Sequence, residues 1–99
     1  MNQYTEALAR ANLVRSERAE IKRALVAGEC SPLDLLRDPP VSCRRVPVHD
    51  FLGWLPHWGD RRADRTLLAA QVSGRLTLEQ LTDRARGALA EQLSRRNAR

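Results

Sequence analysis

The chain has 99 residues, enough for one modest hydrophobic core, and 42% of them are hydrophobic, as in ordinary globular domains. Its charge is more distinctive, because 17 basic residues against 12 acidic ones give a net charge of +5 and Lys22 is the only lysine. A small basic domain favours a polyanionic partner such as nucleic acid over an anionic membrane surface or an acidic protein. Arginine suits phosphate because its planar guanidinium offers a fork of donors, although a GC-rich genome also raises arginine content.

The composition argues against several classes of protein. Cys30 and Cys43 are the only cysteines and no signal peptide is recognisable, so we expect no disulfide framework. No apolar run approaches the roughly 18–20 residues that span a membrane, and we expect a cytoplasmic protein without membrane insertion. The cysteines, His49 and His57 match none of the short ligand spacings of zinc sites, so we predict no metal and no cofactor. Without a nucleophile elbow, a glycine loop or paired carboxylates, we also predict no enzymatic activity.

A long helix is predicted for residues 5–27. Neither glycine nor proline interrupts it, good helix formers dominate, and Gly28 follows where a C-terminal cap is expected. At about 1.5 Å per residue the helix would be roughly 35 Å long, so we expect its N-terminal end to project from the domain. Arg15, Arg18 and Lys22 share one edge of its apolar face, where they form either an additional basic surface or a solvated one.

Shorter helices are predicted in the middle of the chain. Ser31 and Pro32 suit the cap and the first position of a short helix, which the sequence DPP at residues 38–40 ends. A loop over residues 41–47 then leads to a third helix, which we expect at residues 48–55.

The C-terminal half predicts a fourth helix at residues 61–72, with Asp60 as its N-cap. A short turn at residues 78–81 and a last helix at residues 83–96 follow, and each is preceded by a threonine that can cap it. No strand pattern and no internal repeat is present, so the predicted fold is all-α.

The stretch VHDFLGWLPHWG at residues 48–59 holds every aromatic residue except Tyr4 and leads directly into an arginine-rich helix start. Its apolar segment breaks at Pro56, and the chain turns before the next helix begins. The N–H groups of a first helical turn have no partner inside the helix, and the helix dipole is positive there. This junction therefore predicts an anion site. We expect Trp54 in the core, and packing under the hairpin for Trp58 rather than stacking on a base.

Three arginines follow the hairpin at helical spacing. Arg61 and Arg62 precede Arg65 by four and three residues, so all three can converge on one run of phosphates. Asp60 and Asp64 are interspersed among them, so a solvated face held by salt bridges is the alternative.

This ordered set of motifs resembles one family, the actinobacterial integration host factors of the mycobacterial and streptomycete type. These are small helix-two-turns-helix proteins, unrelated in fold to the heterodimeric enterobacterial factor. The matching residues, which run over most of the chain, are Arg18-Ala19-Glu20-x-Lys22-x-x-Leu25 with Gly28, Leu33-x-x-Leu36, Val48-x-x-x-Leu52-x-x-Leu55-Pro56-x-x-Gly59 and Asp83-Arg84-x-Arg86-x-Ala88-Leu89.

The resemblance implies a long N-terminal helix (residues 1–28) on a compact helix-two-turns-helix domain (residues 29–99). It also implies a nucleoid-associated protein that binds double-stranded DNA with little sequence preference, and whose hairpin approaches the minor groove and the phosphates. The family has a small aliphatic residue where this chain has Trp58, and an arginine cluster just before the last helix. Here that cluster is reduced to Arg75, and Glu79 reverses the sign nearby. We therefore expect binding to concentrate at the hairpin.

Together, the residues and the resemblance predict a monomeric, nucleoid-associated protein whose partner is double-stranded DNA, with a recombination or nucleoid protein as a second class of partner. The alternatives are a protein-interaction module and an RNA-binding domain that use the same helical fold. The predicted contact residues are Pro56, His57, Trp58, Gly59, Arg61, Arg62 and Arg65, followed by Arg75, Arg84 and Arg86, with Arg15, Arg18 and Lys22 extending the surface along the long helix.

Overall fold

The computed structural model describes residues 3–97, and its regular elements are helices throughout, which confirms the predicted all-α class. The elements in chain order are α1 (Gln3–Val26), α2 (Pro32–Arg37), the 3₁₀ turn η1 (Val41–Cys43), α3 (Val48–Gly53), α4 (Asp60–Ala70), the 3₁₀ turn η2 (Leu78–Gln80) and α5 (Asp83–Asn97). Strand-like pairing among the described residues is limited to one isolated bridge between Pro47 and Thr77.

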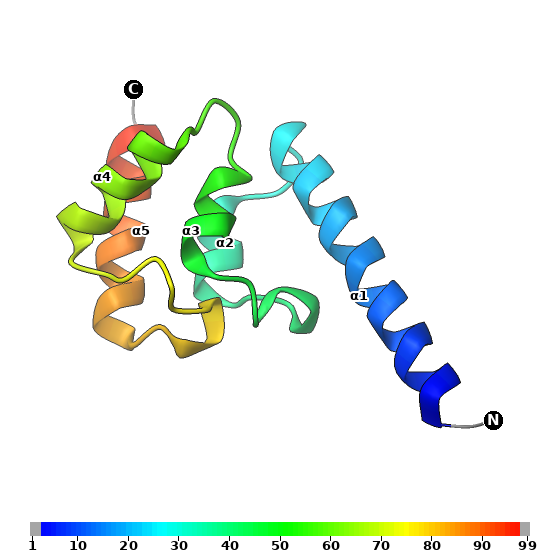
Figure 1. The fold of residues 1–99 in the computed structure, drawn as a ribbon. Coiled ribbons are helices and arrows are strands. Elements are labelled where there is room, and N and C mark those ends of the chain that lie inside the picture. The colour runs from blue at the N-terminus through cyan, green and yellow to red at the C-terminus, as the bar shows by residue number, and fades with distance from the viewer. Residues whose placement is uncertain (1–2, 98–99) are drawn as a thin grey trace.

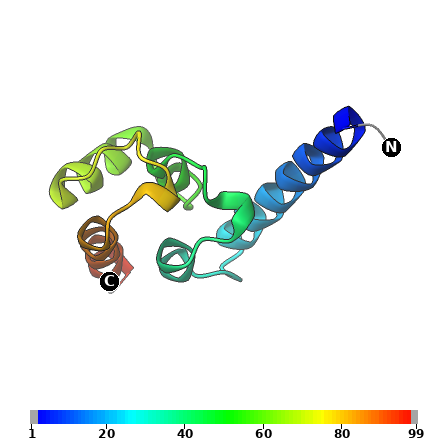
Figure 2. The same ribbon diagram turned by 90° about the horizontal axis from the view of Figure 1, so that it is seen from below.

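The C-terminal end of the long helix α1 packs against the rest of the molecule, and its N-terminal end extends away from it (Figure 1, Figure 2). Its first fully buried side chain is Leu25, close to the end of the helix, whereas Leu8 and Leu13 are exposed. The helix stops because Gly28 adopts a left-handed φ of 76°, as expected for a C-terminal cap.

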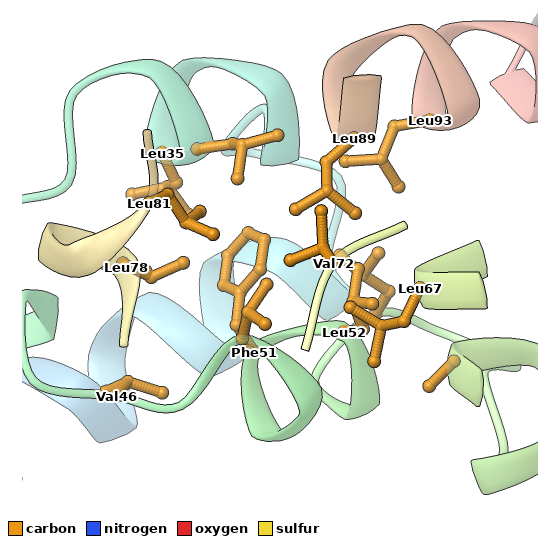
Figure 3. Close-up of a cluster of buried hydrophobic side chains, with 14 of the residues drawn as sticks. Leu35, Val46, Phe51, Leu52, Leu67, Val72, Leu78, Leu81, Leu89 and Leu93 are labelled. Carbon is orange, nitrogen blue, oxygen red and sulfur yellow. The ribbon is translucent and has the colours of Figure 1, made fainter. Parts of the chain in front are cut away.

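The core is assembled from all the other elements around Phe51, which is completely buried (Figure 3). Leu35 of α2, Leu78 of η2 and Leu89 of α5 surround its ring in this view. Each such side chain contributes about 1.5–3 kcal/mol when it is withdrawn from water. The hairpin after α3 is consequently carried on the most deeply buried helix of the domain.

Two predicted helices end earlier than expected, for local reasons. The helix predicted over residues 48–55 ends at Gly53, because Trp54 and Leu55 donate their N–H groups to carbonyls three residues back, at 3.1 and 3.2 Å. The helix predicted to reach residue 72 ends at Ala70, because Gln71 turns left-handed with φ 56°. The N–H of Val72 then closes the end by donating to the Leu67 carbonyl at 3.0 Å.

The predicted caps have different outcomes. The assignment of Asp60 as N-cap is wrong, since Asp60 is the first helical residue of α4 and Gly59 occupies the cap without a side-chain hydrogen bond. Thr82 is confirmed, because its hydroxyl accepts the Ala85 N–H at 3.1 Å at the start of α5. For the turn η2 the predicted cap was Thr77. The observed bond involves the backbone N–H of Thr77, which donates to the Gln80 side chain at the other end of the turn, at 3.0 Å.

Candidate nucleic-acid interface

The hairpin between α3 and α4 is a tight turn closed by a hydrogen bond from the Trp58 N–H to the Leu55 carbonyl at 3.2 Å. Pro56 occupies the second position of this turn, which its fixed φ suits, and His57 occupies the third with φ 67°. A left-handed backbone conformation costs a non-glycine residue about 1–2 kcal/mol. The turn nevertheless has the exposed residue His57 at this position, which favours glycine.

Gly59 links the hairpin to α4, and neither its backbone nor its packing requires a glycine. Its φ of −95° is open to any residue, and a Cβ built on it would meet no atom within 4 Å. The first hydrogen bond of α4 runs from the Ala63 N–H to the Gly59 carbonyl at 3.1 Å, so the amides of residues 60–62 precede the intrahelical pattern. Gly59 thus leaves the positive end of α4 uncovered.

Trp58 and Arg62 form a stacked pair behind the hairpin. The guanidinium carbon of Arg62 lies 4.5 Å from the centre of the Trp58 ring, which is a cation–π distance. Trp58 is partly buried and packs against the core, as predicted, so it fixes the plane on which the guanidinium rests. The Arg62 Nε is buried and has no hydrogen-bond partner in the protein, and its terminal nitrogens are left as the groups that can reach a ligand.

The carboxylates near this junction do not neutralise its arginines. Asp64 turns away to His49 on α3, with 3.1 Å between Oδ1 and Nε2. Among residues 3–97 no ion pair joins Asp60 or Asp64 to an arginine of α4. Arg61 and Arg65 are exposed. The junction therefore presents guanidinium groups and helix N-terminal amides together, as a phosphate site requires, and the expected alternative of a salt-bridged face is not what the geometry shows.

The arginines at the start of α5 occupy a different environment from the one expected of DNA contacts. Arg86 donates to three backbone carbonyls, those of Leu36, Leu78 (2.9 Å) and Leu81 (3.3 Å), and so joins α2 and η2 to α5. Arg84 donates to the carbonyls of residues 70 and 71 at 3.3 and 3.2 Å, where α4 ends. Both side chains satisfy the unpaired carbonyls of neighbouring segments, which sequence reasoning missed.

The basic residues of α1 and the loop before α5 are also separated by the fold. Arg18 donates its Nε to the Ser42 carbonyl at 2.6 Å, which ties α1 to η1. The Lys22 ammonium lies 5.6 Å from the centre of the Trp54 ring, and Trp54 is partly buried rather than fully enclosed in the core. Arg75 lines a groove with His49, and no residue of the hairpin is in the lining of that groove. None of these residues joins the hairpin site.

Three other features bear on function in the described residues: metal-ligating groups, cysteines and long apolar helices. No group of three or more His, Cys, Asp or Glu side chains could hold a metal ion in the part of the chain that the structure describes. Both cysteines are free, and burial raises the pKa of the Cys43 thiol. Within residues 3–97 no helix has the length and apolar character needed to cross a membrane.

The fold and this site define a class: an all-α domain in which an exposed turn precedes the uncovered N-terminus of an arginine-rich helix. The sequence matches no protein-family model and no curated protein. The structure is similar to that of sIHF, which was solved bound to an 8 bp palindromic DNA, with a TM-score of 0.76. The two sequences are 22% identical, and the match covers 85% of this chain and 97% of that one. The likeness establishes the fold, an all-α arrangement shared with sIHF.

Proposed function

We propose that the protein binds double-stranded DNA with little sequence preference, as a nucleoid-associated protein, through the hairpin and the first turn of α4. The observation that carries this proposal is the hairpin–α4 junction, where Arg61 and Arg65 are exposed beside uncovered helix amides. The similarity in fold to sIHF, a DNA-bound protein, supports the choice of DNA as the polyanion.

The groups at the junction suit phosphate better than base edges. Backbone amides and guanidiniums at a helix N-terminus bind phosphate oxygens, which are the same at every base pair and therefore give affinity without sequence information. Arg62 is held against the Trp58 ring by a contact of 4.5 Å, so its terminal nitrogens are preorganised and lose little freedom on binding. Pro56 and His57 form the tip that would approach the groove.

The test is a salt titration on random-sequence duplex with Arg65→Glu and the matched variant Arg37→Glu. Arg37 is equally exposed but lies at the end of α2, so it carries the same change of charge away from the junction. Binding should weaken by about 0.9 log unit per log unit of salt for each phosphate neutralised. Arg65→Glu should reduce both the affinity and this slope. Arg37→Glu should change them only as far as the lower net charge of the protein weakens its attraction to DNA.

Two results would overturn the proposal. One is a folded, helical wild-type protein without measurable duplex binding at low salt. The other is structured RNA that displaces the duplex at equal or lower concentration, which would identify RNA as the partner of the same hairpin.

A further inference from the structure

His57, at the tip of the hairpin, has a strained backbone. Its φ of 67° falls at the third position of a turn, where this geometry favours glycine or asparagine. The turn is held in place by the hydrogen bond from the Trp58 N–H to the Leu55 carbonyl and by the packing of Trp58 against the core. Strained residues of this kind cluster at sites that contact ligands. What the strain maintains here is an exposed imidazole, which glycine would lack.

The imidazole of His57 is not used inside the described part of the protein. It takes part in no hydrogen bond or ion pair found among residues 3–97. His49, the other histidine of the chain, is paired instead, with 3.1 Å between its Nε2 and the Asp64 Oδ1. His57 is therefore the histidine that is available to a ligand outside the protein.

The hairpin borders a pocket of about 670 Å³ whose lining includes the end of α1 and the start of α2. Besides His57, the titratable residues of this lining are Glu29, Cys30, Asp34 and Arg62, and α5 contributes Leu93. Arg23 holds the Glu29 carboxylate at 2.9 Å, so this negative charge is already paired.

The other charges around His57 come in opposed signs. Asp34 favours a protonated imidazole and Arg62 opposes one, and Asp60 and Arg61 at the start of α4 have the same opposed signs. No partner within residues 3–97 therefore fixes the charge of His57. An anion from outside would decide it, because a negative charge close to a histidine favours the protonated form.

The anion site at the start of α4 is within reach of His57. Asp60, the first residue of α4, follows His57 by three residues, so their backbones are at most about 10 Å apart. A DNA strand whose phosphate rests on the α4 amides therefore passes the imidazole. Histidine ordinarily gains or loses its charge between about pH 5 and pH 8, so a phosphate contact made by this side chain depends on pH.

We propose that His57 binds a DNA phosphate as an imidazolium, so that the affinity for duplex DNA rises as the pH falls. This inference rests on the proposed binding of duplex DNA at the hairpin. The direction follows from proton linkage: the complex binds more protons than the free protein, so a lower pH favours the complex.

The experiment measures the affinity of the full-length protein for a fluorescent random-sequence duplex at about pH 5.5 and about pH 8, on either side of the ordinary titration of histidine. The wild type should bind about fivefold more tightly at the lower pH, which is the strength of an exposed ion pair. The salt dependence should also be steeper there, by up to about 0.9 log unit per log unit of salt for the one additional phosphate.

Three variants assign this pH dependence to one side chain. His57→Gly suits the left-handed backbone and removes the imidazole, so it should stay folded and bind equally well at both pH values. His57→Lys keeps a positive charge at both, so at the higher pH it should bind about fivefold more tightly than the wild type. His49→Gln is the matched control, because it removes the other histidine and leaves the hairpin intact, and it should keep the pH dependence of the wild type.

The outcomes separate this inference from the proposed function. A folded wild-type protein that binds no duplex at either pH contradicts the proposed function. Duplex binding of equal strength at both pH values contradicts the inference alone, and so does a pH dependence that survives in His57→Gly or disappears in His49→Gln. A His57→Lys variant that binds no more tightly than the wild type at the higher pH would show that the tip of the hairpin is remote from phosphate, and it would also overturn the inference.

Discussion

The starts of α4 and α5 have similar sequences and opposite environments. Each helix opens with an aspartate followed by arginine, as Asp60-Arg61-Arg62 and as Asp83-Arg84-Ala85-Arg86. In α4 the arginines are exposed or stacked on Trp58, without a carboxylate partner among the described residues. In α5 they donate to backbone carbonyls of the protein itself. The same residue type is therefore left available at the surface in one helix and bonded to the protein itself in the other.

The difference arises from what precedes and faces each helix. An exposed turn precedes α4, and among the hydrogen bonds of residues 3–97 none joins the side chain of Arg61, Arg62 or Arg65 to a carbonyl of another segment. The start of α5 faces the ends of α2 and α4 and the turn η2, whose last carbonyls have no partners within their own helices. Arginine can satisfy several such carbonyls at once because its guanidinium has five donors in one plane. Whether an arginine side chain bonds to the protein or stays exposed is therefore decided by the unpaired carbonyls near it more than by the local sequence.

The largest predicted effect comes from Arg86→Met, which removes the donors but keeps much of the side-chain volume. Three carbonyls lose their partner, so we expect the free energy of unfolding to fall by about 2–4 kcal/mol. The affinity of the folded fraction for duplex DNA should remain within about twofold, because Arg86 is outside the proposed interface. A tenfold loss of affinity would require a loss of about 1.4 kcal/mol of binding free energy. Urea unfolding and binding at low temperature measure the two quantities. A stable variant with weakened DNA binding would place Arg86 in the interface instead.

Trp58→Val tests whether the aromatic ring positions Arg62. The variant loses the cation–π contact and part of the buried area, so the free energy of unfolding should fall by about 1–2 kcal/mol. DNA affinity should fall by about fivefold, because Arg62 is no longer held in place. Trp54→Val is the control, because Trp54 is also partly buried and has Lys22 over its ring, but it contacts no residue of α4 that we assign to binding. Trp54→Val should lower stability alone. An equal loss of affinity in both variants would mean that the effect is a general consequence of destabilisation.

Most of the fold was predictable because the helices of this chain are bounded by residues with strong local preferences. Gly28, Pro32 and the prolines at residues 39 and 40 mark helix ends through backbone geometry alone. The errors lie at ends without such a residue. The helix predicted over residues 48–55 ends two residues early, in a tight turn. The helix predicted to reach residue 72 ends at Gln71, which adopts a left-handed conformation that favours glycine or asparagine. Tertiary packing decided these ends, and a single sequence does not display it.

The candidate site was only partly predictable. The hairpin residues and the arginines of α4 are adjacent in sequence, so a local pattern was enough to group them. Arg84, Arg86 and Arg18 were predicted as contacts together with them, and their carbonyl partners lie 5 to 50 residues away. Such partners depend on which helix ends meet in space. The pairing of Asp64 with His49 was missed for the same reason.

Gly59→Ser separates the two functions that a helix N-terminus can have. The oxygen of a serine at the N-cap accepts a hydrogen bond from a free N–H group of the first turn of α4, so stability should rise by a few tenths of a kcal/mol relative to glycine. The same oxygen occupies the amides and fills the space that a phosphate would use, so DNA affinity should fall by about threefold to tenfold. Gly53→Ser is the control, since a Cβ there also meets no atom within 4 Å. A Gly59→Ser variant that binds DNA normally would exclude the α4 amides from the interface.

Asp60→Asn is expected to have the smallest effect, and the sign of that effect is informative. Asp60 is the first residue of α4, where its charge stabilises the helix dipole and repels a phosphate. Removing the charge should therefore lower the free energy of unfolding by about 0.3–1 kcal/mol and raise DNA affinity by a few fold. Asp50→Asn makes the same change in the first turn of α3, away from the hairpin. It should lower stability without the comparable gain in affinity, because only at the start of α4 do the carboxylate and the DNA phosphate compete for the same amides.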